Sequence, residues 1–429
     1  MDEKVNTLYQ LGVSLYEAQE YEPAALCFKE AAELFHPVAQ YWFARCLEWG
    51  LGVTADADDA FAWYERAAQL GNPQAQCRLG DASRDGERGE PDVKAAFGWY
   101  LQAAEQGYAP AMEYAGTGLF FGIGTDKDMA QAVKWYEKAA EAGDARAQYN
   151  LALCFKYGDG TDKDEKAAFT WARKASEQAY PDALNELGLM YYYGAGTDQD
   201  ISEAAEFFRL SAMGGHAAGQ NNYGQRLYFG QGVKQDMEAA ADWLEKSALQ
   251  GYADAQVSLG MCYYHGNGRA QDGAKALYWI ELAVDQGSPA GINALALLYF
   301  NGVGVQQDYG QAASLSQLAA HKGNAEAMHR LGVCYANGLG VEADQVAAYR
   351  WFEAAAAKGH ALSMMVTGGM LLDGIGVDKD EAAGAAWLKQ AANRGDKSGM
   401  KRLADCLEQG IGVEKDAEAA AVWRTKASE

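Results

Sequence analysis

The chain has 429 residues, 49% of them hydrophobic, and a formal net charge of -23 at pH 7. Such an acidic surface repels phosphate, which argues against binding to nucleic acids or anionic membranes and is compatible with a basic partner. No run of 18 or more residues is apolar, so we expect no membrane insertion. The first residues include acids where a signal peptide carries a basic segment, and we therefore expect a cytoplasmic protein.

The first predicted element is a helical hairpin within residues 1–38. It carries Leu11-Gly12 in its first helix and Ala31-Ala32 in its second. The loop between the two predicted helices is four residues shorter than in the units that follow, and no glycine pair marks it. We therefore separate residues 1–38, as an N-terminal hairpin, from residues 39–429.

A pattern of 36 residues then recurs without insertion or loss. Its eleven units start at residues 39, 75, 111, 147, 183, 219, 255, 291, 327, 363 and 399. We number the places of each unit from that first residue. Place 12 is always glycine, typical of a helix C-cap with positive φ, and place 18 is always aspartate, which caps a helix N-terminus. The unit from residue 111 thus predicts helices from Ala111 to Phe121 and from Asp128 to about Ala142.

Small and aromatic residues complete the pattern. Place 6 is always glycine or alanine and place 22 is alanine in all units but one, which lets two helices approach closely. Place 25 is tryptophan in nine units, and we interpret it as a structural wedge. A fixed period of this length indicates stacked helical hairpins. We predict an all-α fold, a right-handed α-α superhelix (solenoid) of about twelve hairpins in one continuous array.

These residues resemble the Sel1-like repeat family, a relative of the tetratricopeptide repeats. One unit shows the features that carry the resemblance: Ala183, Leu187-Gly188, Tyr191, Gly194, Gly196, Asp200, Ala204, Ala212 and Gly215. The resemblance covers residues 39–429, whereas the hairpin of residues 1–38 looks like a plain tetratricopeptide hairpin. In tetratricopeptide arrays the first helices line a concave groove, and the resemblance implies the same arrangement here.

Motifs that carry chemistry are nearly absent. The chain has no HExxH, Walker A or GxSxG motif, and an isolated Ser398-Gly-Met-Lys401 lacks the companion motifs of a penicillin-binding enzyme. The six histidines are scattered and the seven cysteines form no CxxC, so we predict no metal site and no cofactor. Five cysteines share place 8, which we interpret as small buried hydrophobes in a reducing compartment: Cys46, Cys154, Cys262, Cys334 and Cys406.

The candidate binding surface is one stripe of the first helices, formed by places 3, 4, 7, 10 and 11. In the units from residue 111 to residue 291 this stripe is rich in aromatics and amides: Tyr114, Phe120, Phe121, Tyr149, Asn150, Tyr157, Asn185, Tyr192, Tyr193, Asn221, Asn222, Tyr228, Phe229, Tyr264, His265, Asn293 and Phe300. Rings can hold the side chains of an extended peptide, and asparagine can bond its backbone. Packing of the same side chains against one another along the array is the alternative interpretation.

Two functions fit this pattern. The first is a non-catalytic scaffold or adaptor that binds a peptide or protein partner in the groove. The alternative is an enzyme or small-ligand binder of the cell-wall-related hydrolase type, as the resemblance to some secreted Sel1-like proteins allows. We favour the scaffold and predict no enzymatic activity, because the motifs that such chemistry needs are missing.

Overall fold

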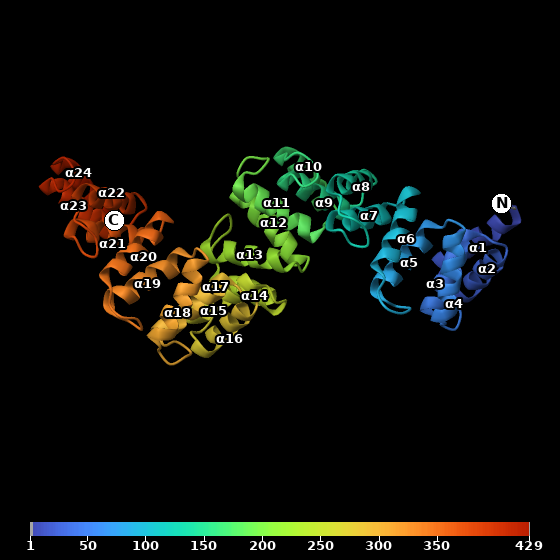
Figure 1. Ribbon diagram of the computed structural model, residues 1–429. Helices are drawn as coiled ribbons and strands as arrows, with labels where there is room; N and C mark the ends of the chain where they lie inside the picture. The colour runs from blue at the N-terminus through green and yellow to red at the C-terminus, as the bar shows by residue number, and fades with distance from the viewer. Residues whose placement is uncertain (1–2, 429) are drawn as a thin grey trace. The chain divides into compact units, whose positions relative to one another are not determined.

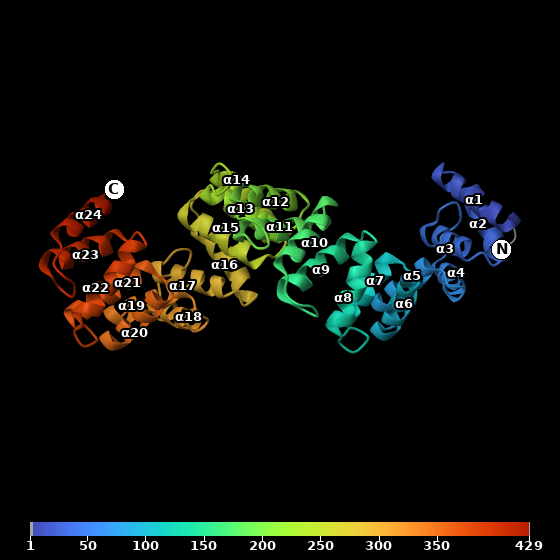
Figure 2. The ribbon, with the colours of Figure 1, turned by 90° about the horizontal axis from the view of Figure 1, so that it is seen from above.

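The computed structural model describes residues 3–428, which form 24 α-helices and no strand. The chain divides into two compact units, one up to Gly214 and one from Gly215. Within each unit, antiparallel helical hairpins follow one another side by side (Figures 1 and 2). The fold is therefore all-α, and each unit is a stretch of α-α solenoid, as the repeat predicts.

The first unit contains α1 (Glu3–Glu17), α2 (Tyr21–Glu33), α3 (Pro37–Trp49), α4 (Ala57–Gln69), α5 (Pro73–Asp85), α6 (Val93–Glu105), α7 (Ala109–Phe121), α8 (Met129–Glu141), α9 (Ala145–Tyr157), α10 (Glu165–Glu177), α11 (Pro181–Tyr193) and α12 (Ile201–Met213). The second unit contains α13 (Ala217–Phe229), α14 (Met237–Leu249), α15 (Ala253–His265), α16 (Gly273–Asp285), α17 (Pro289–Asn301), α18 (Tyr309–His321), α19 (Ala325–Asn337), α20 (Gln345–Ala357), α21 (Ala361–Asp373), α22 (Glu381–Asn393), α23 (Lys397–Gln409) and α24 (Ala417–Ser428).

The predicted helix caps are confirmed. Gly122, at place 12, ends α7 with a φ of 73°, and the Asp128 side chain accepts a hydrogen bond from the backbone N–H of Gln131 at the start of α8. The first helix of this hairpin begins at Ala109, two residues before the predicted start. The N-cap positions just before the first helices form a second row that the sequence pattern did not reveal. At α7 this position is Tyr108, whose side chain makes no capping bond and which a proline follows in the first turn. In most other first helices the side chain at this position accepts a backbone N–H. His36, for example, accepts the N–H of Ala39 through Nδ1.

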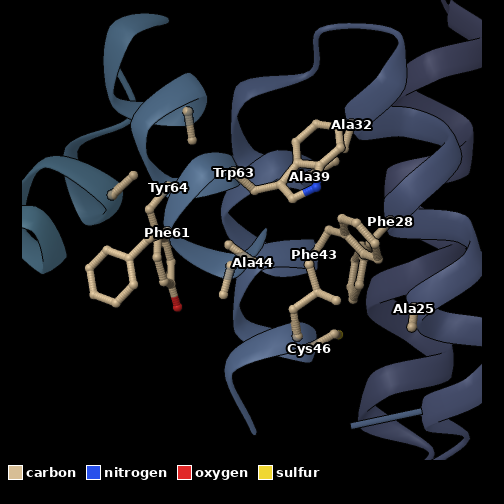
Figure 3. Packing of buried hydrophobic residues seen from close by; sticks show 14 of the residues in the cluster. Ala25, Phe28, Ala32, Ala39, Phe43, Ala44, Cys46, Phe61, Trp63 and Tyr64 are labelled. Carbon is tan, nitrogen blue, oxygen red and sulfur yellow. The ribbon is translucent and has the colours of Figure 1, made fainter. Parts of the chain in front are cut away.

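Close contact between the two helices of a hairpin follows from the small residues at places 6 and 22. A methyl group at Gly116 would meet the ring of Tyr136, at place 26, at 2.7 Å and the carbonyl of Ala132 at 3.3 Å. In the first hairpins, Phe43 meets Trp63 edge to face with ring centroids 5.5 Å apart (Figure 3). Tryptophan at place 25 thus packs against its own hairpin, in agreement with the wedge interpretation.

Within each unit, adjacent hairpins are joined through the glycine at place 14, except in the repeat from residue 75, which has Arg88 there. Gly124 has a φ of 73°, and a methyl group on it would overlap the carbonyl of Val93, the first residue of the preceding second helix. Equivalent glycines make the same approach at other joints within each unit, for example Gly268 against Met237. Only glycine satisfies both the backbone conformation and the space at this joint.

A pair of glutamines, one buried and one exposed, also links the hairpins. Gln76, at place 2, donates to the carbonyl of Ala68 in the preceding second helix at 3.1 Å. Its Oε1 accepts a hydrogen bond from Gln106, at place 32 of the same repeat, at 2.7 Å. The pair recurs wherever place 32 is glutamine, as at Gln148 and Gln178. Four of the eleven repeats carry this pair.

The first helices also touch one another along the array. In the second unit α15 contacts α17, α17 contacts α19, and α21 contacts α23. In the first unit, side chains bridge consecutive first helices, as the 2.7 Å ion pair between Lys156 in α9 and Glu186 in α11 shows. The stripe of places 3, 4, 7, 10 and 11 therefore lies where neighbouring first helices meet. No helix in residues 3–428 is long and apolar enough to cross a membrane.

Candidate partner-binding surface

The side chains at place 11 form the exposed part of the predicted stripe. Each sits at the C-terminal end of a first helix, one residue before the glycine cap. Phe121, Tyr157, Tyr193 and Phe229 expose 64%, 62%, 72% and 61% of their surface, and His265 is also exposed. Contiguous exposed apolar patches mark interaction surfaces, whereas single exposed apolar residues are normal on a protein surface. Phe121, Tyr157 and Tyr193 belong to the first unit, and Phe229 and His265 to the second. We call these five residues, at the same place of successive repeats, the aromatic row.

The aromatics at place 10 are half-buried and have two roles. Tyr192 and Tyr228 each pack edge to face on the ring that follows them, with centroids 5.0 and 4.9 Å apart. The hydroxyl of Tyr228 accepts a hydrogen bond from Asn267 of the next repeat at 2.5 Å. These rings therefore support the aromatic row and also hold the joint. The other aromatics at place 10 are also half-buried: Phe120, Tyr264 and Phe300.

Several of the predicted amides already have partners within the array. Asn150 donates to the buried carboxylate of Glu113 in the preceding repeat at 2.9 Å. Asn293 accepts a hydrogen bond from Arg330 of the next repeat at 2.8 Å. Asn185 and Asn221 are buried, and Asn222 is half-buried. The structure thus gives part of this set a role between repeats, and the capture of a peptide backbone stays a prediction.

The tyrosines at places 3 and 4 likewise pack onto the preceding or following hairpin. Tyr114 stacks on Tyr100 with ring centroids 4.6 Å apart, and the ring centroids of Tyr149 and Tyr180 are 5.6 Å apart. Burial raises the pKa of Tyr149 and of the carboxyl of Glu113. These groups therefore form the base of the stripe, and the more exposed rings at place 11 lie at its rim.

Two of the cavities that open on the stripe are lined by predicted rings of places 10 and 11 from neighbouring repeats. The first, of about 230 Å³, lies between the repeats that start at residues 111 and 147, and its lining includes Phe120, Phe121 and Tyr157. The second, of about 390 Å³, lies between the repeats that start at residues 219 and 255, and its lining includes Tyr228, Phe229 and His265. The structure therefore brings the predicted rings of places 10 and 11 together around a hollow.

Sequence reasoning missed other lining residues of these cavities. Leu153 and Met261 hold place 7, which belongs to the predicted stripe although neither residue was a named candidate, and Cys154 and Cys262 hold place 8, which lies outside it. Burial raises the pKa of the Cys154 thiol to about 12, which makes it a poor nucleophile near neutral pH. Asp159 at place 13 also lines the first cavity. The sequence could have pointed to Asp159, because it is a charged residue at a place where most repeats carry an apolar one.

The chain belongs to the Sel1 repeat family. The family model matches eleven consecutive segments, which are residues 37–72, 73–108, 109–144, 145–180, 181–216, 217–252, 253–288, 289–324, 325–360, 361–396 and 397–429. Each segment contains one hairpin of the structure, beginning at or next to the first residue of a first helix. No curated protein matches the chain.

Solved structures of Sel1 repeat proteins are similar over much of the chain. A protective antigen present in uropathogenic Escherichia coli strains, which displays an SLR fold, is 34% identical, with a TM-score of 0.71 over 94% of this chain and 86% of the other. A Sel1 repeat protein from Oxalobacter formigenes is 30% identical, with a TM-score of 0.50 over 71% of this chain and 88% of the other. Both agree with the hairpin solenoid described above.

Proposed function

We propose that the protein is a non-catalytic interaction scaffold that binds an extended segment of a partner protein along its first-helix stripe. The observation that carries this proposal is the aromatic row, because exposed rings next to cavities are typical of surfaces that anchor a partner. The net charge of -23 favours a basic partner and disfavours nucleic acid. Membership of a repeat family whose extended surfaces suit protein binding supports the same function.

We also propose a reducing, cytoplasmic location. All seven cysteines are free, and six of them are buried, which suits a compartment in which thiols stay reduced. The five cysteines of place 8 expose at most 3% of their surface, as expected for small hydrophobic core residues.

The test of the scaffold function is selection of binding peptides by the full chain from a display library of random linear peptides. Removing Tyr157 and Tyr193 together, by substitution with alanine, should weaken the selected peptides about tenfold or more, since aromatic anchors dominate interface energies. The melting temperature should change little because both rings face solvent.

A matched control is Leu249→Ala, which removes a similarly exposed apolar side chain from a second helix. It should leave peptide affinity unchanged. Failure to select any peptide, or equal loss of affinity in the control, would refute binding through this stripe.

A further inference from the structure

The two cavities on the stripe occupy equivalent positions three repeats apart, yet their chemistry differs. Both contain aromatic side chains at places 10 and 11 and a cysteine at place 8. The differences include places 26, 7, 11 and 13, where the first cavity has Tyr136, Leu153, Tyr157 and Asp159, and the second repeat pair has Leu244, Met261, His265 and Asn267. The same backbone arrangement therefore forms two cavities whose lining side chains differ in chemistry.

The first cavity is surrounded by rings. Phe120 and Phe121 meet edge to face with centroids 4.9 Å apart, and Phe120 lies 6.4 Å from Tyr136. Tyr157 completes the aromatic lining from the next first helix. The faces of such rings carry partial negative charge, so they attract cations as well as apolar groups. The equivalent second cavity replaces two of these rings, and its lining adds the aliphatic side chain of Val257.

Asp159 adds a formal negative charge to the first cavity. Its side chain is half-buried, and within residues 3–428 no hydrogen bond or ion pair of its carboxylate is found. Place 13 carries an apolar residue in most other repeats: Leu51, Ile123, Ala195, Val303, Leu339, Ile375 and Ile411. The equivalent Asn267 instead uses its amide to bond Tyr228 within the array. Asp159 is thus left with charge that no neighbouring cation neutralises.

A carboxylate beside aromatic faces selects a basic side chain. A partly desolvated charge gains most from an opposite charge close by, and the rings add attraction for the same cation. The array already uses such contacts, since the ammonium of Lys156 lies 5.0 Å from the centroid of Tyr157. That ammonium is paired with Glu186 of the next repeat, and therefore does not neutralise Asp159.

We propose that the cavity formed by Phe120, Phe121, Tyr157 and Asp159 binds the side chain of a lysine or arginine from the partner segment. This inference rests on the proposed function and specifies its partner as a segment with a basic anchor. The net charge of the chain favours approach of such a segment, because long-range attraction raises the association rate. The cavity of about 230 Å³ suits one side chain, with the stem against the rings and the charged end at Asp159.

The experiment selects peptides from the same display library of random linear peptides with the full chain and with the variant Asp159→Asn. The variant keeps the shape of the side chain and copies the residue type of the equivalent repeat, so the array should stay folded. We expect one position of the peptides selected by the unmodified chain to be enriched in lysine and arginine. The variant should lose that enrichment.

A double-mutant cycle then locates the contact. Replacing the enriched lysine by norleucine removes the charge and keeps the stem, and it should weaken binding to the unmodified chain about tenfold. The same replacement should have little effect on binding to Asp159→Asn. Asp126→Asn removes an equal charge from an exposed loop residue outside the cavity, and should behave like the unmodified chain.

The outcomes separate the two proposals. Peptides that bind through the aromatic row without any basic preference would overturn the basic anchor and leave the scaffold function standing. The basic anchor is likewise overturned if Asp126→Asn abolishes the lysine preference as strongly as Asp159→Asn, because general charge would then explain it. If no peptide binds to any version of the chain, the scaffold function itself fails.

Discussion

The glutamine pair between hairpins predicts that Leu70→Gln stabilises the protein. In the first 36-residue repeat, Gln40 donates to the carbonyl of Ala32 at 3.1 Å, but its Oε1 is buried without a hydrogen-bond partner. Place 32 of this repeat holds Leu70, whereas Gln106 and its equivalents supply the missing donor at 2.7–2.9 Å in four other repeats. A glutamine at residue 70 should therefore reach Gln40.

The magnitude follows from the buried acceptor. An unsatisfied buried polar group costs about 1–3 kcal/mol, and ordering a long side chain takes back up to about 2 kcal/mol. Leu70 is 48% exposed, so its replacement forfeits little burial. We expect a net gain of about 1 kcal/mol, and Gln106→Leu should lose a similar amount in the neighbouring repeat.

Amide hydrogen exchange is the suitable assay, because repeat arrays open locally. Leu70→Gln should slow exchange in α2, α3 and α4 about fivefold where opening of this joint controls it. Leu70→Met serves as the control, since methionine has comparable length and no donor. The reasoning is refuted if methionine protects as well as glutamine, or if neither Leu70→Gln nor Gln106→Leu changes exchange in its own repeat.

Four further predictions concern the core, the thiols, pH and the stripe. Trp279→Ala should lower the free energy of local unfolding by about 3–5 kcal/mol, because it opens a cavity in the core. Hydrogen exchange should become faster only in α13–α18, and faster exchange along the whole chain would contradict a linear array. All seven cysteines should react with a thiol reagent after denaturation and slowly before it, and any disulfide trapped by alkylation at lysis would contradict a reducing location. Burial lowers the pKa of His329 to about 4. The folded protein therefore holds this imidazole neutral, and stability should fall by about 1–2 kcal/mol as pH drops from about 6.5 towards 4. Exchange in α19–α21 should show this loss, and His329→Gln should reduce it but leave the part due to His360, whose pKa burial also lowers. Asn222→Ala should weaken peptide binding by about 1–3 kcal/mol, and Tyr192→Ala with Tyr228→Ala by more; a destabilised array that keeps full affinity would exclude the stripe.

The fold could be predicted because its determinants are local and repeated. Glycine at place 12 and aspartate at place 18 act within one turn of the helices they cap, so eleven copies of the same spacing make the helix ends evident. The pattern places the start of the first helices two residues late because the residue at their N-cap position varies. It is histidine, asparagine, aspartate or serine, whose side chains cap the helix, or tyrosine, whose side chain does not. A varied position gives no periodic signal even when its geometry is constant.

The candidate site was predictable only as a stripe. The helical period shows which side chains share a face, but it does not show how adjacent repeats divide that face between packing and exposure. Asn150 and Asn293 look like free amides in the sequence, and the structure pairs them across joints with Glu113 and Arg330. Asp159 stands out in the sequence as a charge at a mostly apolar place, but only the structure places it beside the rings of another repeat.

The glycine joint has an evolutionary consequence. Because the loop glycine of one repeat docks on the backbone of the preceding repeat, the contact depends little on which side chains the neighbour carries. Duplication or loss of a complete block of 36 residues would therefore recreate the same junction. A partial block would separate the glycine from the backbone on which it packs. Gene rearrangement can thus lengthen or shorten the array in whole steps, and each new copy is then free to diverge on its exposed stripe towards a different ligand.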